Sequence, residues 1–132
     1  MNLVSMRVIT GDVDRLVRFY EWITGLVATR YTEDFAELAT ASCTLAIGSA
    51  RTVELFGKGA ARPADNHTAI IEFRVADVDK DYERLERVIG EVVQKPTTMP
   101  WGNRSLLFRD PDGNLVNFFA PVTPEARKKF EK

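Results

Sequence analysis

The chain has 132 residues, with 18 basic and 19 acidic side chains, and 45% of its residues are hydrophobic. This composition is typical of an ordinary globular domain. The net charge of -1 offers no excess of positive charge to a phosphate backbone, so we expect no nucleic-acid partner. One His and one Cys cannot build a zinc finger, a three-histidine zinc site or an internal disulfide. Any metal would therefore need carboxylate ligands.

Targeting and membrane segments are not expected. No apolar stretch approaches the roughly 20 residues that span a bilayer. The N-terminal segment reaches Arg7 and Asp12 too early for a signal peptide. We therefore expect a cytoplasmic protein with no membrane partner.

An internal repeat organises the chain. Gly11–Arg15 recurs about half a chain later as Ala76–Lys80, and the same shift carries Gly25 to Gly90. Because the order of strand, helix and further strands is also kept, we expect two copies of one module. We place both in a single domain, 1–132, with module one at about 1–50, a connection at about 51–66, module two at about 67–121 and a tail at 122–132.

The first copy begins with an alternating segment, in which Val8 and Thr10 fall on one face and Arg7 on the other. Asp12 then suits a helix N-cap, and Gly25 suits the left-handed residue just past a helix end. The predicted elements are a strand at 5–10, a helix between Asp12 and Gly25, and strands at 26–32, 35–39 and 43–47.

The connection is rich in Gly, Ala and Pro, and within it Thr52–Phe56 is compatible with either a short strand or a helical turn. The second copy repeats the first, with Asp77 and Gly90 in the two capping roles. Its predicted elements are a strand at 70–75, a helix between Asp77 and Gly90, and strands at 91–95, 104–108 and 115–120.

Two further local signals are clear. Asp110–Asn114 has the Pro, Gly and Asn that a tight turn needs, and it predicts a hairpin between the last two strands. In the tail, Thr123 followed by Pro124 predicts the start of a short helix.

A module of one strand, one helix and three strands makes a small sheet with its helix on one side. Two such modules predict an α+β fold, in which they form a curved mixed sheet with an open cleft and carry their helices on the outer face. Arg7, Glu72 and Arg74 lie on the face away from the helices, where burying them unpaired would be costly. We therefore expect that face to line a solvent-accessible cleft.

Three motifs carry a family resemblance, and together they cover nearly the whole chain in order. They are Asp12–Arg15 with Phe19 and Tyr20, Asp77–Asp79 with Tyr82–Leu85, and Phe108–Asn114. With these motifs the chain resembles the vicinal oxygen chelate superfamily, which includes glyoxalase I, extradiol dioxygenases, fosfomycin resistance enzymes and bleomycin resistance proteins. The resemblance implies the two-module fold and a homodimer. It does not set the activity, because the fold hosts lyases, transferases, oxygenases and non-catalytic drug binders.

The resemblance also implies where metal ligands would lie: at the first and last strands of each copy. Those positions fall on Ser5, Ile70 and Asn117, and the fourth on either Ala46 or Glu54. A divalent metal needs three or four nitrogen or oxygen ligands, with two or more of them anionic or imidazole. The sequence therefore predicts a site with no metal and no cofactor.

The candidate ligand-binding residues lie on the predicted cleft face. Arg7 and Glu72 occupy equivalent positions of the repeat, and the pair either orients a polar ligand or forms a structural ion pair between the modules. Arg74 is available to a carboxylate or phosphate, and Trp101, between Pro and Gly, suits a rigid wall for a flat ligand. The full set is Arg7, Phe35, Glu72, Arg74, Trp101, Asn117 and Phe119.

Three functional hypotheses follow. The first is a metal-free homodimer, similar to bleomycin resistance proteins, that sequesters a small molecule in its cleft. The second is a metal-dependent lyase, isomerase or dioxygenase whose degenerate site uses Glu54 and His67. The third is a metal-free enzyme in which Glu72 or Arg7 acts directly, so the sequence leaves catalysis itself undecided.

Overall fold

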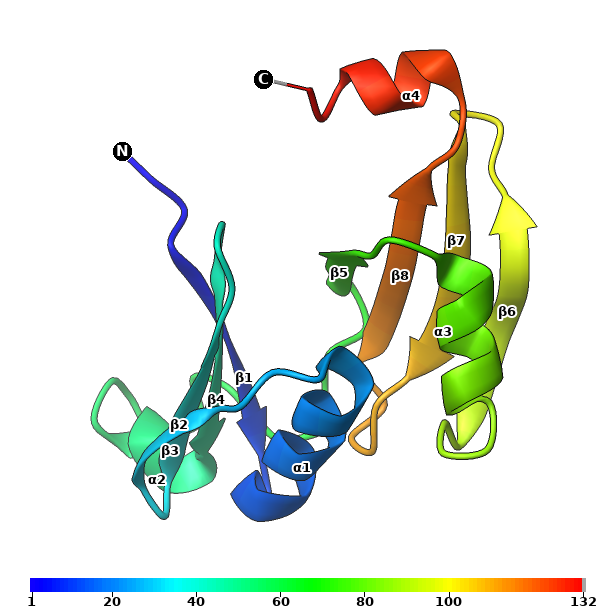
Figure 1. Cartoon of the computed structure of the whole chain (residues 1–132). Helices are drawn as coiled ribbons and strands as arrows, with labels where there is room; N and C mark the ends of the chain where they lie inside the picture. The colour runs from blue at the N-terminus through cyan, green and yellow to red at the C-terminus, as the bar shows by residue number, and fades with distance from the viewer. Residues whose placement is uncertain (132) are drawn as a thin grey trace. The chain divides into compact units, whose positions relative to one another are not determined.

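The computed structural model describes residues 1–131 and divides the chain into two compact units. The first unit comprises Met1–Asn66 together with Pro111–Gly113, and the second comprises 67–110 and the segment from Asn114 onward. The division between Asn66 and His67 coincides with the end of the predicted connection. Each unit contains one strand, one helix and three further strands in that order (Figure 1).

The first unit forms a four-stranded sheet in the order β1-β4-β3-β2. The edge strand β1 is parallel to β4, and the other pairs are antiparallel. The elements are β1 (Ser5–Thr10), α1 (Val13–Thr24), β2 (Thr29–Thr32), β3 (Phe35–Ala39), β4 (Thr44–Ser49) and α2 (Ala50–Glu54).

The second unit repeats this topology, with a four-stranded sheet in the order β5-β8-β7-β6 and a parallel β5-β8 pair. The elements are β5 (Ile70–Arg74), α3 (Val78–Leu85), β6 (Glu91–Thr98), β7 (Asn103–Arg109), β8 (Leu115–Pro121) and α4 (Pro124–Lys128). The α+β class and the repeated module are therefore confirmed, with the strands hydrogen-bonded into two separate sheets.

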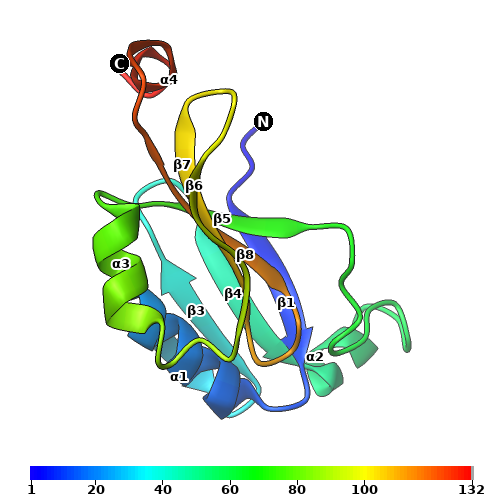
Figure 2. The ribbon, with the colours of Figure 1, turned by 90° about the vertical axis from the view of Figure 1, so that its right-hand side faces the viewer.

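Each sheet has one face covered by its helix, α1 in the first unit and α3 in the second (Figure 2). The predicted faces are confirmed: Val8 and Thr10 are buried beneath α1 while Arg7 is exposed. In β5, likewise, Ile71 is buried and Glu72 is exposed. The opposite face of each sheet is not covered by α1 or α3, and we call these the helix-free faces. At one end of the first of them, Thr52 of α2 lies beside Gly48 of β4.

The first helix has the predicted caps. The Asp12 carboxylate accepts a hydrogen bond from the Arg15 backbone N–H at 3.0 Å, and Gly25 is left-handed with φ 73°. Asp77 caps α3 in the same way, through the N–H of Lys80. These caps satisfy N–H groups that have no partner within the helix.

The predicted end of the second helix is wrong, because α3 stops at Leu85 and Gly90 is not left-handed. The following residues form a tight turn instead, in which the N–H groups of Val88 and Ile89 both donate to the Leu85 carbonyl. Adjacent β-branched side chains lower helix propensity, and Ile89 gains burial in the turn. These two effects explain the shorter helix.

The ambiguous segment of the connection is helical, since α2 covers Ala50–Glu54. The tail prediction is confirmed, because Pro124 opens α4 and Thr123 Oγ1 accepts from the Ala126 N–H at 3.2 Å. No helix within residues 1–131 is long and apolar enough to cross a membrane.

An ion pair on the covered side of the second sheet ties β7 to α3. Arg104 contacts Asp79 with both ends of its guanidinium, at 2.7 and 2.8 Å. The hydrogen bond from Arg104 lowers the pKa of Asp79 below its ordinary value. Both side chains are partly exposed, so the pair contributes little to stability and mainly sets the position of the helix start.

Candidate functional site

The helix-free face of the first sheet holds an arginine against two aromatic rings. The Arg7 guanidinium carbon lies 4.9 Å from the centre of the Phe35 ring and 5.3 Å from that of Phe56. Phe56 follows α2 and is 75% exposed. A guanidinium stacked on rings keeps its in-plane N–H groups available for an oxygen ligand. Among residues 1–131, no acidic side chain forms an ion pair with Arg7.

The strand register places small and polar side chains beside this arginine. Arg7 on β1 pairs with Ala46 on β4, which in turn pairs with Glu37 on β3. Tyr31 has its ring centre 6.0 Å from that of Phe35, and its hydrogen bond to Glu37 raises the pKa of Tyr31 above the ordinary value. The face therefore presents a cation, a phenol, a carboxylate and aromatic rings.

Of this group the sequence identified Arg7 and Phe35 and missed Tyr31, Glu37 and Phe56. The signal for Glu37 was present, because period-two alternation from Phe35 puts both on one face. Phe56 could not be placed while its segment was compatible with either a strand or a helical turn. Tyr31 is adjacent to a register irregularity between Arg30 and Thr32, which alternation alone does not reveal.

The helix-free face of the second sheet contains an asparagine held by a glutamate. Asn117 pairs in register with Glu72, and its side-chain Nδ2 donates to Glu72 Oε2 at 2.8 Å. Asn117 is only 9% exposed, and its Oδ1 is buried with no hydrogen-bond partner. Leaving a buried acceptor unpaired costs on the order of 1–3 kcal/mol. The Glu72 carboxylate can only accept, so it determines which way the Asn117 amide is turned.

A second unpaired oxygen belongs to the same row of residues across the sheet. Gln94 on β6 pairs with Leu107 on β7, and Leu107 pairs with Asn117 on β8. Residues paired in register share a sheet face, so Gln94 and Asn117 lie on the same side with Leu107 between them. Gln94 Oε1 is also buried with no hydrogen-bond partner. Sequence reasoning missed Gln94, because β6 has register irregularities on both sides of it.

The C-terminal segment covers two of the predicted ligand-binding residues. The Arg74 guanidinium carbon lies 4.9 Å from the centre of the Phe130 ring, and the Phe119 and Phe130 ring centres are 5.7 Å apart. Phe130 follows directly after α4 and its cap. Arg74 and Phe119 are therefore already in contact with the chain's own tail, which the sequence did not indicate. Trp101 is 66% exposed, and its role as a wall for a ligand stays a prediction.

The positions that correspond to metal ligands in the family do not fit a metal. The registers of Arg7 with Ala46 and of Glu72 with Asn117 are equivalent, which confirms the alignment that selects Ala46. Glu54 lies in α2 and not on a strand. Within residues 1–131, no three His, Cys, Asp or Glu side chains come together as a metal site.

The four positions supply no anionic or imidazole ligand, because they carry Ser5, Ala46, Ile70 and Asn117. Such a set cannot offset the cost of dehydrating a divalent ion. We derive no chemistry through a metal at this place.

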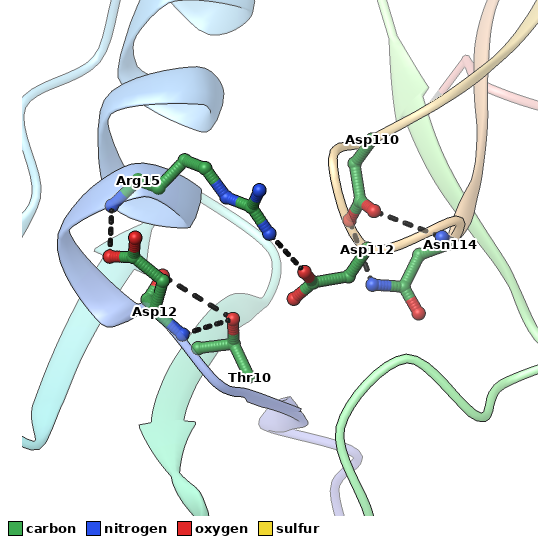
Figure 3. A network of polar contacts seen from close by, with 6 residues as sticks. All are labelled: Thr10, Asp12, Arg15, Asp110, Asp112 and Asn114. Carbon is green, nitrogen blue, oxygen red and sulfur yellow. Dashed lines mark hydrogen bonds and ion pairs between the residues drawn. The ribbon is translucent and has the colours of Figure 1, made fainter.

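The Asp-Pro-Asp-Gly-Asn motif, by contrast, is structural (Figure 3). Asp110 is buried, and its two carboxylate oxygens accept from the backbone N–H and the side-chain Nδ2 of Asn114, at 2.9 and 2.8 Å. Gly113 is left-handed with φ 84°, as this tight turn requires. The predicted hairpin is confirmed, and its carboxylates are engaged in holding the turn.

The tip of this turn, Pro111–Gly113, belongs to the first unit. There the Asp112 carboxylate accepts a hydrogen bond from the Arg15 guanidinium at 2.8 Å. In the same network Asp12 donates its backbone N–H to Thr10 Oγ1 at 3.1 Å, at the start of α1 (Figure 3). Asp12 therefore acts at the start of α1, where its carboxylate caps the helix.

Comparisons with known proteins agree with this architecture. The chain is 27% identical over 125 residues to the uncharacterized protein YraH of Bacillus subtilis (strain 168), covering 90% of this chain and 98% of that protein. A glyoxalase/bleomycin resistance protein/dioxygenase from Nocardioides is 24% identical, with a TM-score of 0.75, covering 94% of this chain and 85% of that one.

A glyoxalase/bleomycin resistance protein/dioxygenase family enzyme from Burkholderia phytofirmans PsJN is 16% identical, with a TM-score of 0.82, covering 92% of this chain and 100% of that one. At these identities the two solved structures show a shared fold. The model of the Glyoxalase/Bleomycin resistance protein/Dioxygenase superfamily matches residues 2–118. The chain therefore belongs to the glyoxalase/bleomycin resistance protein/dioxygenase superfamily.

Proposed function

We propose that this protein is a metal-free small-molecule binder of the superfamily, which takes up a planar organic anion at Arg7. One observation carries the proposal: the Arg7 guanidinium lies against the Phe35 and Phe56 rings at the register position of Ala46, where a metal-binding member would carry an anionic ligand. A cation with aromatic neighbours thus lies beside the position at which a metal-binding member would carry its carboxylate. The Arg7 guanidinium can bind an anion directly, so no metal ligands are needed.

The chemistry of this face selects the ligand class. The in-plane N–H groups of an arginine match the two oxygens of a carboxylate, and such pairs are stronger than neutral hydrogen bonds. The Phe35 and Phe56 rings offer apolar surface to a flat ring attached to that carboxylate. An aromatic carboxylate is the simplest molecule that uses both features.

The proposal is tested by titrating the full-length protein with 2-naphthoate and, as its uncharged counterpart, 2-naphthamide. We expect saturable binding of naphthoate, with Arg7→Gln weakening it about tenfold or more because the charge-assisted contacts are lost. Arg7→Lys should restore part of the affinity. Arg18→Gln on α1 is the control, because it removes a charge from an exposed arginine that forms an ion pair elsewhere in the same unit.

Two results would refute this function. One is naphthoate affinity that does not change in Arg7→Gln. The other is equal affinity for naphthoate and naphthamide, because the arginine would then contribute no selectivity for the anion.

We also propose that the protein acts as a homodimer, as the superfamily resemblance implies. Leu55 and Phe56 follow α2 as two consecutive apolar residues that are largely exposed in the single chain. A second chain that covers these two side chains would remove apolar surface from water. The mass of the native assembly measures this directly.

A further inference from the structure

We propose that the helix-free face of the second sheet binds a primary ammonium group, through Asn117 Oδ1 and Gln94 Oε1. Both oxygens are buried and both lack a hydrogen-bond partner, so each has an unmet need for a donor. The inference extends the proposed function by naming a second chemical class that this protein takes up. It concerns different residues from Arg7, and it is tested with a different probe.

The two oxygens belong to one row of side chains. Gln94, Leu107 and Asn117 are paired in register on β6, β7 and β8, and they share the helix-free face. Adjacent strands are about 4.8 Å apart, so the backbones of Gln94 and Asn117 are about 10 Å apart, within reach of a group lying over Leu107. A donor seated there can meet both oxygens.

Glu72 leaves only hydrogen-bond acceptors available on the row of Gln94, Leu107 and Asn117, so the row binds hydrogen-bond donors. Its carboxylate accepts from Asn117 Nδ2 at 2.8 Å, which uses up the donor side of that amide and turns Oδ1 away from β5. The group that remains available on Asn117 is therefore an acceptor. Glu72 acts as a positioning residue, and its negative charge also favours a cation close to the row.

An ammonium group fits this arrangement better than the alternatives. A carboxylate would face acceptor oxygens and a negative charge. A divalent metal would find one carboxylate, already engaged by Asn117, and two amides, which falls short of the oxygen ligands it needs. Arg74, two residues from Glu72 on the same strand, stacks on Phe130. A neutral alcohol satisfies one oxygen and gains nothing from the charge of Glu72.

The test uses three probes of matched shape: benzylamine, which is an ammonium ion at neutral pH, benzyl alcohol and benzoate. Binding to the full-length protein is followed by NMR of the side-chain amides of Asn117 and Gln94. We expect benzylammonium to bind more tightly than benzyl alcohol, and benzoate to leave both amides unshifted. Asn117→Leu and Gln94→Leu should each weaken benzylammonium binding about tenfold or more, as expected for losing a hydrogen bond to a charged group.

The variants are chosen so that a folding defect does not decide the outcome. Asn117 is buried, so its variant is accepted only if the thermal unfolding midpoint is retained, while Gln94 is half-buried and Gln94→Leu provides the second test. Glu83→Gln on α3 controls for unspecific attraction of a cation, because it removes a negative charge from an exposed residue that is not on the helix-free face. The benzylammonium affinity of Glu83→Gln should equal that of the wild type.

The proposal is overturned if benzylammonium leaves both amides unshifted, which would mean that buried water alone satisfies the two oxygens. It is equally overturned if Gln94→Leu and a folded Asn117→Leu bind benzylammonium as the wild type does. Failure here with naphthoate binding intact refutes only this inference. Failure of naphthoate with benzylammonium binding intact refutes only the function proposed for Arg7.

Discussion

Replacing Gly102 by alanine is expected to lower the free energy of unfolding by about 3 kcal/mol and to detach the C-terminal helix. Gly102 has φ 91°, a conformation that side chains strongly disfavour. A Cβ there would collide with Thr123 Oγ1 and lie 3.0 Å from the Cβ of Ala126. The Gly102 carbonyl also accepts the N–H groups of Val122 and Thr123, at 2.9 and 3.3 Å. The strain therefore falls on the residues that begin α4.

Urea unfolding followed by circular dichroism measures this loss. Gly11→Ala is the matched control, because Gly11 has no positive φ and a Cβ there would meet nothing within 4 Å. The control should stay within about 0.5 kcal/mol of the wild type. Equal stability of the two variants would show that Gly102 does not anchor the tail. If α4 detaches, Phe130 should also leave Arg74 and Phe119, which ring-proton shifts of Phe130 would report.

Replacing Asp110 by alanine is expected to cost about 2–3 kcal/mol of unfolding free energy. Asp110 is 5% exposed and accepts two hydrogen bonds from Asn114, so alanine would leave a buried N–H and a buried amide without these acceptors. Asp110→Asn should lose about half as much, because its Oδ1 still accepts from the Asn114 N–H. Urea unfolding of the wild type, Asp110→Asn and Asp110→Ala ranks their free energies of unfolding.

The result separates a structural motif from a catalytic one. A structural Asp110 predicts the order wild type, Asp110→Asn, Asp110→Ala in unfolding midpoint. If all three proteins unfold at the same urea concentration, the carboxylate is not holding the turn, and a different role must be sought for it.

The parts of the fold that depend on local chemistry could be predicted from the sequence. The alternation of β1, the Asp12 cap, the Gly25 cap and the Asp110–Asn114 turn are each set by residues only a few positions away. The end of α3 depends instead on Ile89 gaining burial in a turn, which is a tertiary effect. Local capping preference at Gly90 was overridden there.

The candidate site was predictable to a smaller extent. Repeat alignment located the equivalence of Arg7 and Glu72, because it requires only strand register. It could not show that Phe56 comes to stack on Arg7, since that contact joins a strand to the residues after a helix. Nor could it show that Phe130 covers Arg74, because the path of a tail over a sheet is not encoded in alternation.

Native mass spectrometry of the purified protein tests the central claim most directly, namely that this site works without a metal. The assembly should have the mass of two chains with no added metal, because the four family positions carry Ser5, Ala46, Ile70 and Asn117. Addition of excess Ni²⁺, Zn²⁺, Mn²⁺ or Fe²⁺, followed by desalting, should leave that mass unchanged. One retained divalent ion per chain would contradict the account, and a single-chain mass at micromolar concentration would refute the proposed dimer.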